Sequence, residues 1–277
     1  MESSLPQVAR PLPRRRTVHY TLSLWLLAAP LLLLIAAPVL ALVARVDFSL
    51  FLANLTSNVV IRAISLSLVT SLIATLLALC FGLPLAYLLA RRQFRGKMIV
   101  DTLIDLPMIL PPAVAGIALL LAFGRRGLIG APLAEFGITL AFTQVAVIMA
   151  QTFVAAPYFV KAATAALLGV ERELEQSAAL DGASPLQVFV AITIPLSWPV
   201  LSSGLVMTWA RALGEFGATI IFAGNLAGRT QTMPLAIYLG FERDLQLAIV
   251  LALVLLGVAF LVLLIVKGWL RQRVGAV

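Results

Sequence analysis

Six stretches of this 277-residue chain contain no Asp, Glu, Lys or Arg over 19 or more consecutive residues. A helix that crosses the hydrocarbon core of a bilayer needs about 20 predominantly apolar residues. Strands of a membrane barrel would be shorter and would alternate apolar with polar residues, which these stretches do not. The sequence therefore predicts an all-α polytopic membrane protein, with six transmembrane helices built around 20–44, 63–90, 106–124, 136–160, 182–210 and 245–266.

The composition excludes two other classes of protein. Hydrophobic residues make up 62% of the chain and charged residues only 12%, whereas soluble domains average about 25% charged residues. Disordered chains are poor in apolar residues, so disorder is excluded as well. The net charge of +8 would suggest nucleic acid in a soluble protein. In a membrane protein the retention of basic loops in the cytoplasm explains this charge, and we expect membrane lipid rather than nucleic acid as its surroundings.

The basic residues also predict the orientation of the chain. With the N-terminus inside, 13 of the 20 Lys and Arg residues lie in cytoplasmic segments and six in outer loops. The cytoplasmic residues lie within 10–16, 91–97, 161–172 and 267–273. This asymmetry places both termini in the cytoplasm.

The first apolar stretch is 25 residues long, beyond the 7–15 residues of a signal-peptide core, and it is interpreted as an uncleaved helix. We expect a cytoplasmic tail at 1–19 and the first helix with its outer loop at 20–60. The transmembrane core follows at 61–268, and a second cytoplasmic tail ends the chain at 269–277.

Residues that could support catalysis are scarce. The only histidine is His19, and the only cysteine is Cys80, in an apolar run where small apolar packing is expected. No phosphate-binding G-x-x-x-x-G-K-[ST] motif occurs, so nucleotide binding by this motif is excluded. We expect no catalytic residue, no metal site, no cofactor and no enzyme activity, which leaves a transporter, a channel or a membrane anchor.

Proline interrupts the third predicted span. Pro107, Pro111 and Pro112 fall within six positions of DLPMILPPAVAG, and proline in a helix interior removes a backbone hydrogen bond. Broken helix at membrane depth is tolerated where protein or a water-filled cavity surrounds it. These prolines indicate either part of a translocation path or a helix start near the membrane surface.

The fifth predicted span carries a charged pair. Arg211 and Glu215 are four residues apart in a region, 182–228, without other charges, and a lone Arg at mid-bilayer costs about 2.5–3.5 kcal/mol. The pair either lines a translocation path or locks helices together. Gly214 and Gly217 permit a kink or close helix approach, and Phe216 is a gate or a packing residue. Asn225 and 230–232 offer neutral hydrogen-bonding groups or form a solvated loop.

The segment 161–195 has the pattern of an angled hairpin. Apolar and small residues recur at helical spacing up to Ala178, and Gly182 is suited to a helix C-terminus. Ser184, Pro185 and Gln187 then form the pattern of a capped short helix, and Pro195 precedes the next span. The hairpin is interpreted either as a docking device for another protein or as an ordinary loop.

This hairpin resembles the EAA loop of ABC-importer permeases, E-A-A-x-x-x-G followed by I-x-L-P. Here Gln176, Ser177, Ala178 and Gly182 are followed by Ile192-Thr193-Ile194-Pro195, with Gln, Ser and Ile as departures from the motif. The resemblance implies a coupling loop, 161–195, that fits a groove on a separate ATPase subunit. It identifies as coupling residues Leu174, Glu175, Gln176, Ser177, Ala178, Ala179, Asp181, Gly182 and Ala183.

Three further stretches, 105–130, 210–225 and 228–238, resemble the molybdate, sulfate and tungstate permeases, most closely the molybdate branch. The resemblance implies a type I ABC-importer permease core in the cytoplasmic membrane of a prokaryote. It also implies two ATPase subunits, a second copy of this chain and an external oxyanion-binding protein. Molybdate import is therefore expected, with sulfate or tungstate import as alternatives and a passive anion channel as the rival from another class. The path residues expected are Pro107, Pro111, Pro112, Arg211, Gly214, Glu215, Phe216 and Gly217.

Overall fold

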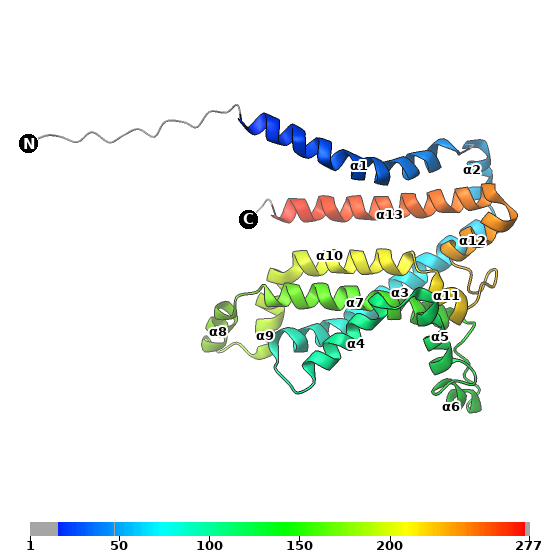
Figure 1. Cartoon of the computed structure of the whole chain (residues 1–277). Coiled ribbons are helices and arrows are strands. Elements are labelled where there is room, and N and C mark those ends of the chain that lie inside the picture. The colour runs from blue at the N-terminus through cyan, green and yellow to red at the C-terminus, as the bar shows by residue number, and fades with distance from the viewer. Residues whose placement is uncertain (1–15, 47, 275–277) are drawn as a thin grey trace, which may run out of the picture. The chain divides into compact units, whose positions relative to one another are not determined.

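The computed structural model describes residues 16–46 and 48–274, and throughout these residues the regular structure is helical. The chain divides into two compact units, Met1–Asp47 and Phe48–Val277. The second unit contains the helices that carry both candidate sites (Figure 1). The helices are α1 Arg16–Ala44, α2 Phe48–Leu55, α3 Asn58–Arg91, α4 Lys97–Ile109, α5 Pro112–Phe123, α6 Gly130–Glu135, α7 Gln144–Leu168, α8 Arg172–Leu180, α9 Pro185–Val188, the π-helical turn η1 Phe189–Thr193, α10 Ile194–Leu213, α11 Gly217–Phe222, α12 Met233–Arg243 and α13 Leu245–Val274.

The first unit consists of α1, which is helical throughout the predicted first span and contains Pro30 and Pro38. Its described apolar side chains are mostly exposed, among them Trp25 and Leu27. An apolar helix with no buried face is typical of a segment surrounded by lipid.

Small residues hold the second unit together. Helix α3 packs along α7, which in turn packs along α10, and Ala74, Ala155 and Ala212 meet where these three helices come together. A Cβ atom at Gly204 of α10 would lie only 2.6 Å from the Ala162 Cβ of α7. Because lipid gives helices no hydrophobic reason to associate, spanning helices rely on such close backbone approach.

The long helices give the bundle two distinct ends (Figure 1). One end holds the α3–α4 loop, α8 and α9, and the other holds α5, α6, α11 and α12. Helix α13 packs against α12 and α10, and its first turns lie against α12, where Gly240 approaches Ala248. The segment between the fifth and sixth predicted spans is thus partly helical, because α12 occupies its second half.

The third predicted span is not one straight helix. Helices α4 and α5 meet at an angle of 117°, and the break falls at Leu110 and Pro111, both with extended backbone angles. Pro112 then occupies the first turn of α5, where its missing N–H costs nothing. The described residues contain five helices long and apolar enough to span a membrane, or six if this bent pair is one span.

Two helix boundaries differ from those predicted. Helix α7 begins after the Thr143 cap and runs through Pro157 to Leu168, so it starts and ends later than the predicted span 136–160. Pro157 is buried, and packing by neighbouring helices makes a proline tolerable inside a span.

One continuous helix runs over Pro185–Leu213, which matches the fifth predicted span, 182–210, to within three residues at each end. The chain passes Pro195 by widening into the π-helical turn, where the Ile194 N–H donates to the Phe189 carbonyl five residues earlier. Cys80 is exposed on the surface of α3.

Candidate coupling and translocation sites

Helix α8 stands at one end of the bundle and is closed by a glycine turn. Gly182 has a φ of +91°, its N–H donates to the Ala179 carbonyl at 3.1 Å, and the Ala183 N–H donates to the Ala178 carbonyl at 3.0 Å. These two bonds form the Schellman motif, in which glycine is preferred because its left-handed backbone would strain other residues. The local structure predicted for Gly182 is confirmed.

After the glycine turn, a second local motif at Ser184 starts the next helix, α9. The Ser184 hydroxyl accepts from the Gln187 N–H at 3.4 Å, and the Gln187 side chain accepts from the Ser184 N–H at 2.7 Å. This is a capping box, with Pro185 in the first helical position. Because α9, η1 and α10 are continuous, the glycine turn is joined without a flexible linker to a spanning helix.

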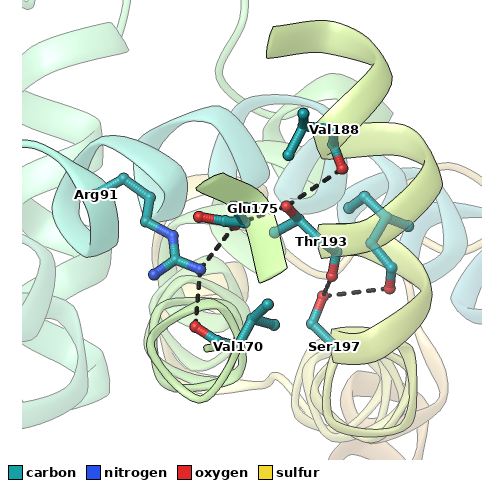
Figure 2. Close-up of polar contacts among 7 residues, drawn as sticks. Arg91, Val170, Glu175, Val188, Thr193 and Ser197 are labelled. Carbon is teal, nitrogen blue, oxygen red and sulfur yellow. Dashed lines mark hydrogen bonds and ion pairs between the residues drawn. The ribbon is translucent and has the colours of Figure 1, made fainter. Parts of the chain in front are cut away.

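Glu175 ties α8 to the rest of the bundle, as Figure 2 shows. Its Oε1 accepts from Arg91 Nη2 of α3 at 2.8 Å and from the Thr193 hydroxyl of η1 at 2.7 Å. Arg91 also donates to the Val170 carbonyl at 3.1 Å. The Arg91 side chain is only 8% exposed and that of Glu175 19%. The carboxylate of Glu175, one of the predicted coupling residues, is thus hydrogen-bonded within this chain.

The predicted coupling residues divide between two faces of α8. Glu173, Ser177, Leu180 and Asp181 form an exposed face, which we call the docking face, and Leu180 is 88% exposed. Leu174 is 45% exposed, and Ala178 and Ala183 are half-buried. Gln176 and Ala179 lie on another side of the helix, beside Arg91 and Arg92.

We predict that Arg91→Leu loosens α8 while the bundle stays folded. The substitution leaves the Glu175 carboxylate with only the Thr193 hydroxyl, and a hydrogen bond to a charged group contributes about 1.5–3 kcal/mol. Hydrogen exchange of the α8 amides should accelerate by about tenfold or more. Arg95→Leu is the matched control, since Arg95 is an exposed arginine on the adjoining loop. Equal exchange in both variants would show that the Arg91–Glu175 pair does not hold α8.

The opposite end of the bundle holds the Arg211–Glu215 pair. Arg211 Nη1 lies 2.8 Å from Glu215 Oε2, with the carboxylate side chain 1% exposed and the arginine 30% exposed. The other carboxylate oxygen accepts from the Ala218 N–H at 2.8 Å. Glu215 thus satisfies a free backbone donor at the start of α11 and neutralises Arg211 at the end of α10.

Two chain breaks meet beside this pair. Helix α10 ends at Gly214 and α11 begins after Phe216. A Cβ at Gly217 would lie 2.4 Å from the Pro112 Cβ of α5, so only glycine permits this approach. Among the predicted path residues the structure thus brings the Pro111–Pro112 break and the 214–217 segment together, whereas Pro107 lies inside α4, before the break. The Phe216 ring packs on Tyr238 of α12 with centroids 5.3 Å apart.

The neutral residues after α11 are not a solvated loop. Thr230, Gln231 and Thr232 are buried, and the Thr230 hydroxyl accepts from the Leu226 N–H at 3.0 Å. Gln231 donates to Asn225 at 3.0 Å, and Asn225 donates to the Leu235 carbonyl of α12 at 3.1 Å. This segment therefore ties α11 to α12 through internal hydrogen bonds.

Sequence reasoning missed a charged cluster between α4 and α7. Lys161 Nζ lies 2.8 Å from Asp101 and 2.9 Å from Asp105. The two aspartates are one helical turn apart, which was a visible signal that they share a face. Nothing in the sequence pairs them with Lys161, 56 or more residues away. The cluster fastens α4 to α7 and is partly exposed.

A bundle of spanning helices with an exposed hairpin at one end and a charged, broken-helix junction at the other is typical of a membrane-transport permease. Residues 82–276 match the family described as the binding-protein-dependent transport system inner membrane component. The chain belongs to this family, which confirms the predicted ABC-importer permease class and a transport subunit rather than an enzyme.

Individual relatives agree with this family. The chain is 46% identical over 220 residues to the molybdenum transport system permease protein ModB of Mycobacterium tuberculosis, covering 79% of this chain and 83% of that protein. It is 35% identical over 222 residues to a probable sulfate transport system permease protein cysT of Nephroselmis olivacea, covering 80% and 78%. Among solved structures, the chain is similar to a bacterial alginate ABC transporter in complex with its alginate-bound periplasmic protein. The two folds superpose with a TM-score of 0.74 at 19% sequence identity, over 93% of this chain and 96% of that chain.

The predicted fold class, all-α with a type I ABC-importer permease core, is confirmed, whereas the orientation of the termini stays a prediction. The family places the chain in the inner membrane as a multi-pass protein. It also implies an ATPase subunit and a substrate-binding protein as partners.

Proposed function

We propose that this chain is the permease subunit of an ATP-driven importer of molybdate. The observation that carries the proposal is the rigid attachment of α8 to α10. The glycine turn, the capping box and the bond from Thr193 to Glu175 connect an exposed docking face to a spanning helix without a flexible linker. A force applied to α8 by an ATPase would thus reach α10.

Helix α10 also links the α8 hairpin to the second candidate site, the junction around Arg211 and Glu215. The helix runs from the coupling end to the junction that holds Arg211, Glu215, Gly214, Phe216 and Gly217. A displacement of α10 would change the contact between Gly217 and Pro112 and the environment of Arg211. We infer that this junction lines or gates the oxyanion path, with Arg211 as the cation that faces the cargo.

The assembly that we propose contains two copies of this chain, two ATPase subunits and one external oxyanion-binding protein. Both termini, the loop at 91–97 and the α8 hairpin lie in the cytoplasm, a proposal supported by the distribution of basic residues. A reporter enzyme fused after Lys97 that is active only outside the cell would contradict this orientation.

Molybdate is preferred over sulfate because the ModB relative is more similar than the sulfate permease, 46% against 35% identical. Tungstate is an oxyanion of the same shape and charge and stays an alternative cargo. A passive anion channel does not require a helix that binds an ATPase, so the exposed docking face argues against a channel.

The test is uptake into proteoliposomes that contain the chain, its gene-neighbour ATPase and the binding protein. We expect molybdate uptake that requires ATP and exceeds sulfate uptake by about tenfold or more, a difference of about 1.4 kcal/mol. Tungstate is assayed in parallel. Preferred sulfate uptake would reassign the cargo within the family, and molybdate flux without ATP or ATPase would favour the channel.

A further inference from the structure

An apolar groove lies between the end of α3 and the hairpin that follows α8. Its volume is about 510 Å³, within the range of small-molecule sites. Leu83, Pro84 and Leu88 of α3 form one wall, and Leu186 and Phe189 form the other. Leu186 is 71% exposed, so the groove is an open surface feature of this chain.

A basic hollow of about 260 Å³ adjoins this groove. Tyr87 and Arg92 line both, so the apolar groove continues directly into the hollow. Arg91 and Arg172 add two further guanidinium groups to the hollow, against the single carboxylate of Glu175. The combined site is apolar along one part and positively charged at the other.

The charge of the basic hollow is not neutralised within the described residues. Glu175 pairs with Arg91, but neither Arg92 nor Arg172 forms an ion pair with any residue in 16–46 or 48–274. The buried Arg91 Nε atom also has no hydrogen-bond partner there. Two exposed arginines and a free buried donor around one hollow attract an anion with several acceptor oxygens.

The position of the site identifies the source of that anion. The charge-free part of α3 ends at Ala90, so Arg91 and Arg92 stand where the apolar span meets the polar loop. A phospholipid has the same arrangement, with acyl chains on the apolar side of this boundary and a phosphate on the polar side. Basic pockets at the cytoplasmic ends of spanning helices favour anionic lipids for this reason.

We propose that the apolar groove and the basic hollow together bind one anionic phospholipid. An acyl chain lies against Leu83, Leu88 and Phe189, and the phosphate is bound by Arg92 and Arg172. The lipid bridges the end of α3 to α8 and the helix that follows it. Arg172, Gln176 and Ala179 of α8 line the hollow, and Gln176 lies one helical turn from Leu180 of the docking face. The lipid site therefore adjoins the docking face but does not include Ser177, Leu180 or Asp181.

The experiment is native mass spectrometry of the delipidated full-length chain in mild detergent. Equal amounts of phosphatidylglycerol and phosphatidylcholine with identical acyl chains are added. We expect the chain to retain phosphatidylglycerol about tenfold more than phosphatidylcholine, a preference of about 1.4 kcal/mol. Equal retention would overturn the proposal, and this comparison requires no variant to fold.

Variants then locate the site. Arg92→Gln with Arg172→Gln should reduce phosphatidylglycerol retention to the phosphatidylcholine level. The control is Arg125→Gln with Arg126→Gln, which removes the same charge from exposed positions outside both hollows. Leu186→Gln should weaken retention through the acyl chain. Retention that falls equally in the control pair would overturn the proposal, because it would indicate unspecific attraction.

A competition experiment separates the lipid from other sources of anion. Millimolar inorganic phosphate or glycerol phosphate should leave the bound phosphatidylglycerol in place, because neither ligand fills the apolar groove. Displacement by these ions would mean that the hollow binds a soluble anion. Addition of the ATPase should likewise leave the lipid bound, and its release would assign the groove to the ATPase. The outcome is independent of which oxyanion is transported.

Discussion

Replacing Arg211 by methionine is expected to lower the free energy of unfolding by about 3–5 kcal/mol. The substitution leaves the Glu215 carboxylate, 1% exposed, with only the Ala218 N–H as a partner. Glu215→Gln should destabilise less, because its amide oxygen still accepts from Ala218 and because Arg211, 30% exposed, can reach water. Unfolding in increasing fractions of dodecyl sulfate measures the difference.

The double variant Arg211→Met with Glu215→Gln should recover most of the stability lost in Arg211→Met. It removes both charges and retains the hydrogen bond that starts α11. Double mutants separate a pairwise interaction from the separate effects of each substitution. A double variant as unstable as the sum of the single variants would show that the two side chains act independently.

Transport by the same double variant decides the role of Arg211. If Arg211 faces the oxyanion, uptake per unit of folded protein should fall by at least about tenfold, equivalent to about 1.4 kcal/mol. If the pair only locks α10 to α11, the folded double variant should transport at the wild-type rate. The second result would contradict the path role while leaving the importer function intact.

Gly182→Leu is expected to weaken binding of the ATPase by about tenfold or more while the bundle still inserts and folds. A leucine in the left-handed region costs about 1–2 kcal/mol, which strains the turn that closes α8. Apart from its two chain neighbours, no described residue lies within 4 Å of a Cβ at Gly182, so the added side chain projects beside the docking face. Copurification of the tagged variant with the ATPase measures the loss.

Gly137→Leu is the matched control for this experiment. Gly137 also has a positive φ, +77°, and a Cβ there likewise meets nothing within 4 Å. Gly137 lies between α6 and α7, away from the α8 hairpin. Both variants should therefore lose similar stability, but only Gly182→Leu should lose the ATPase. Wild-type recovery of the ATPase with Gly182→Leu would contradict the docking role.

Local features near both sites could be predicted from the sequence. The glycine at 182 and the Ser184–Gln187 capping box depend on residues within one turn of each other, so backbone stereochemistry and hydrogen bonding fix them locally. The spacing of Arg211 and Glu215 likewise predicted a shared face, and the two side chains form an ion pair. The prolines at 111 and 112 predicted an irregular helix, which the 117° bend confirms.

Contacts between distant segments could not be predicted in this way. Glu175 lies one residue before the position that aligns with the acid of the coupling motif, and its carboxylate faces Arg91, 84 residues away in the chain. The polar residues 230–232 have the composition of a solvated loop, yet they are buried, and Thr230 and Gln231 form hydrogen bonds with Leu226 and Asn225. Pro195 ends a helix on local grounds, whereas here a π-helical turn carries the helix past it.

The sequence by itself determined the membrane location, the number of apolar segments and the family, because bilayer thickness and local motifs act on consecutive residues. Only the tertiary structure decided which charges neutralise one another, which face of α8 is free and where the Gly217 segment meets Pro112. The physical reason is that ion pairs and close packing depend on distances across the bundle. Helix arrangement sets those distances, and sequence separation does not.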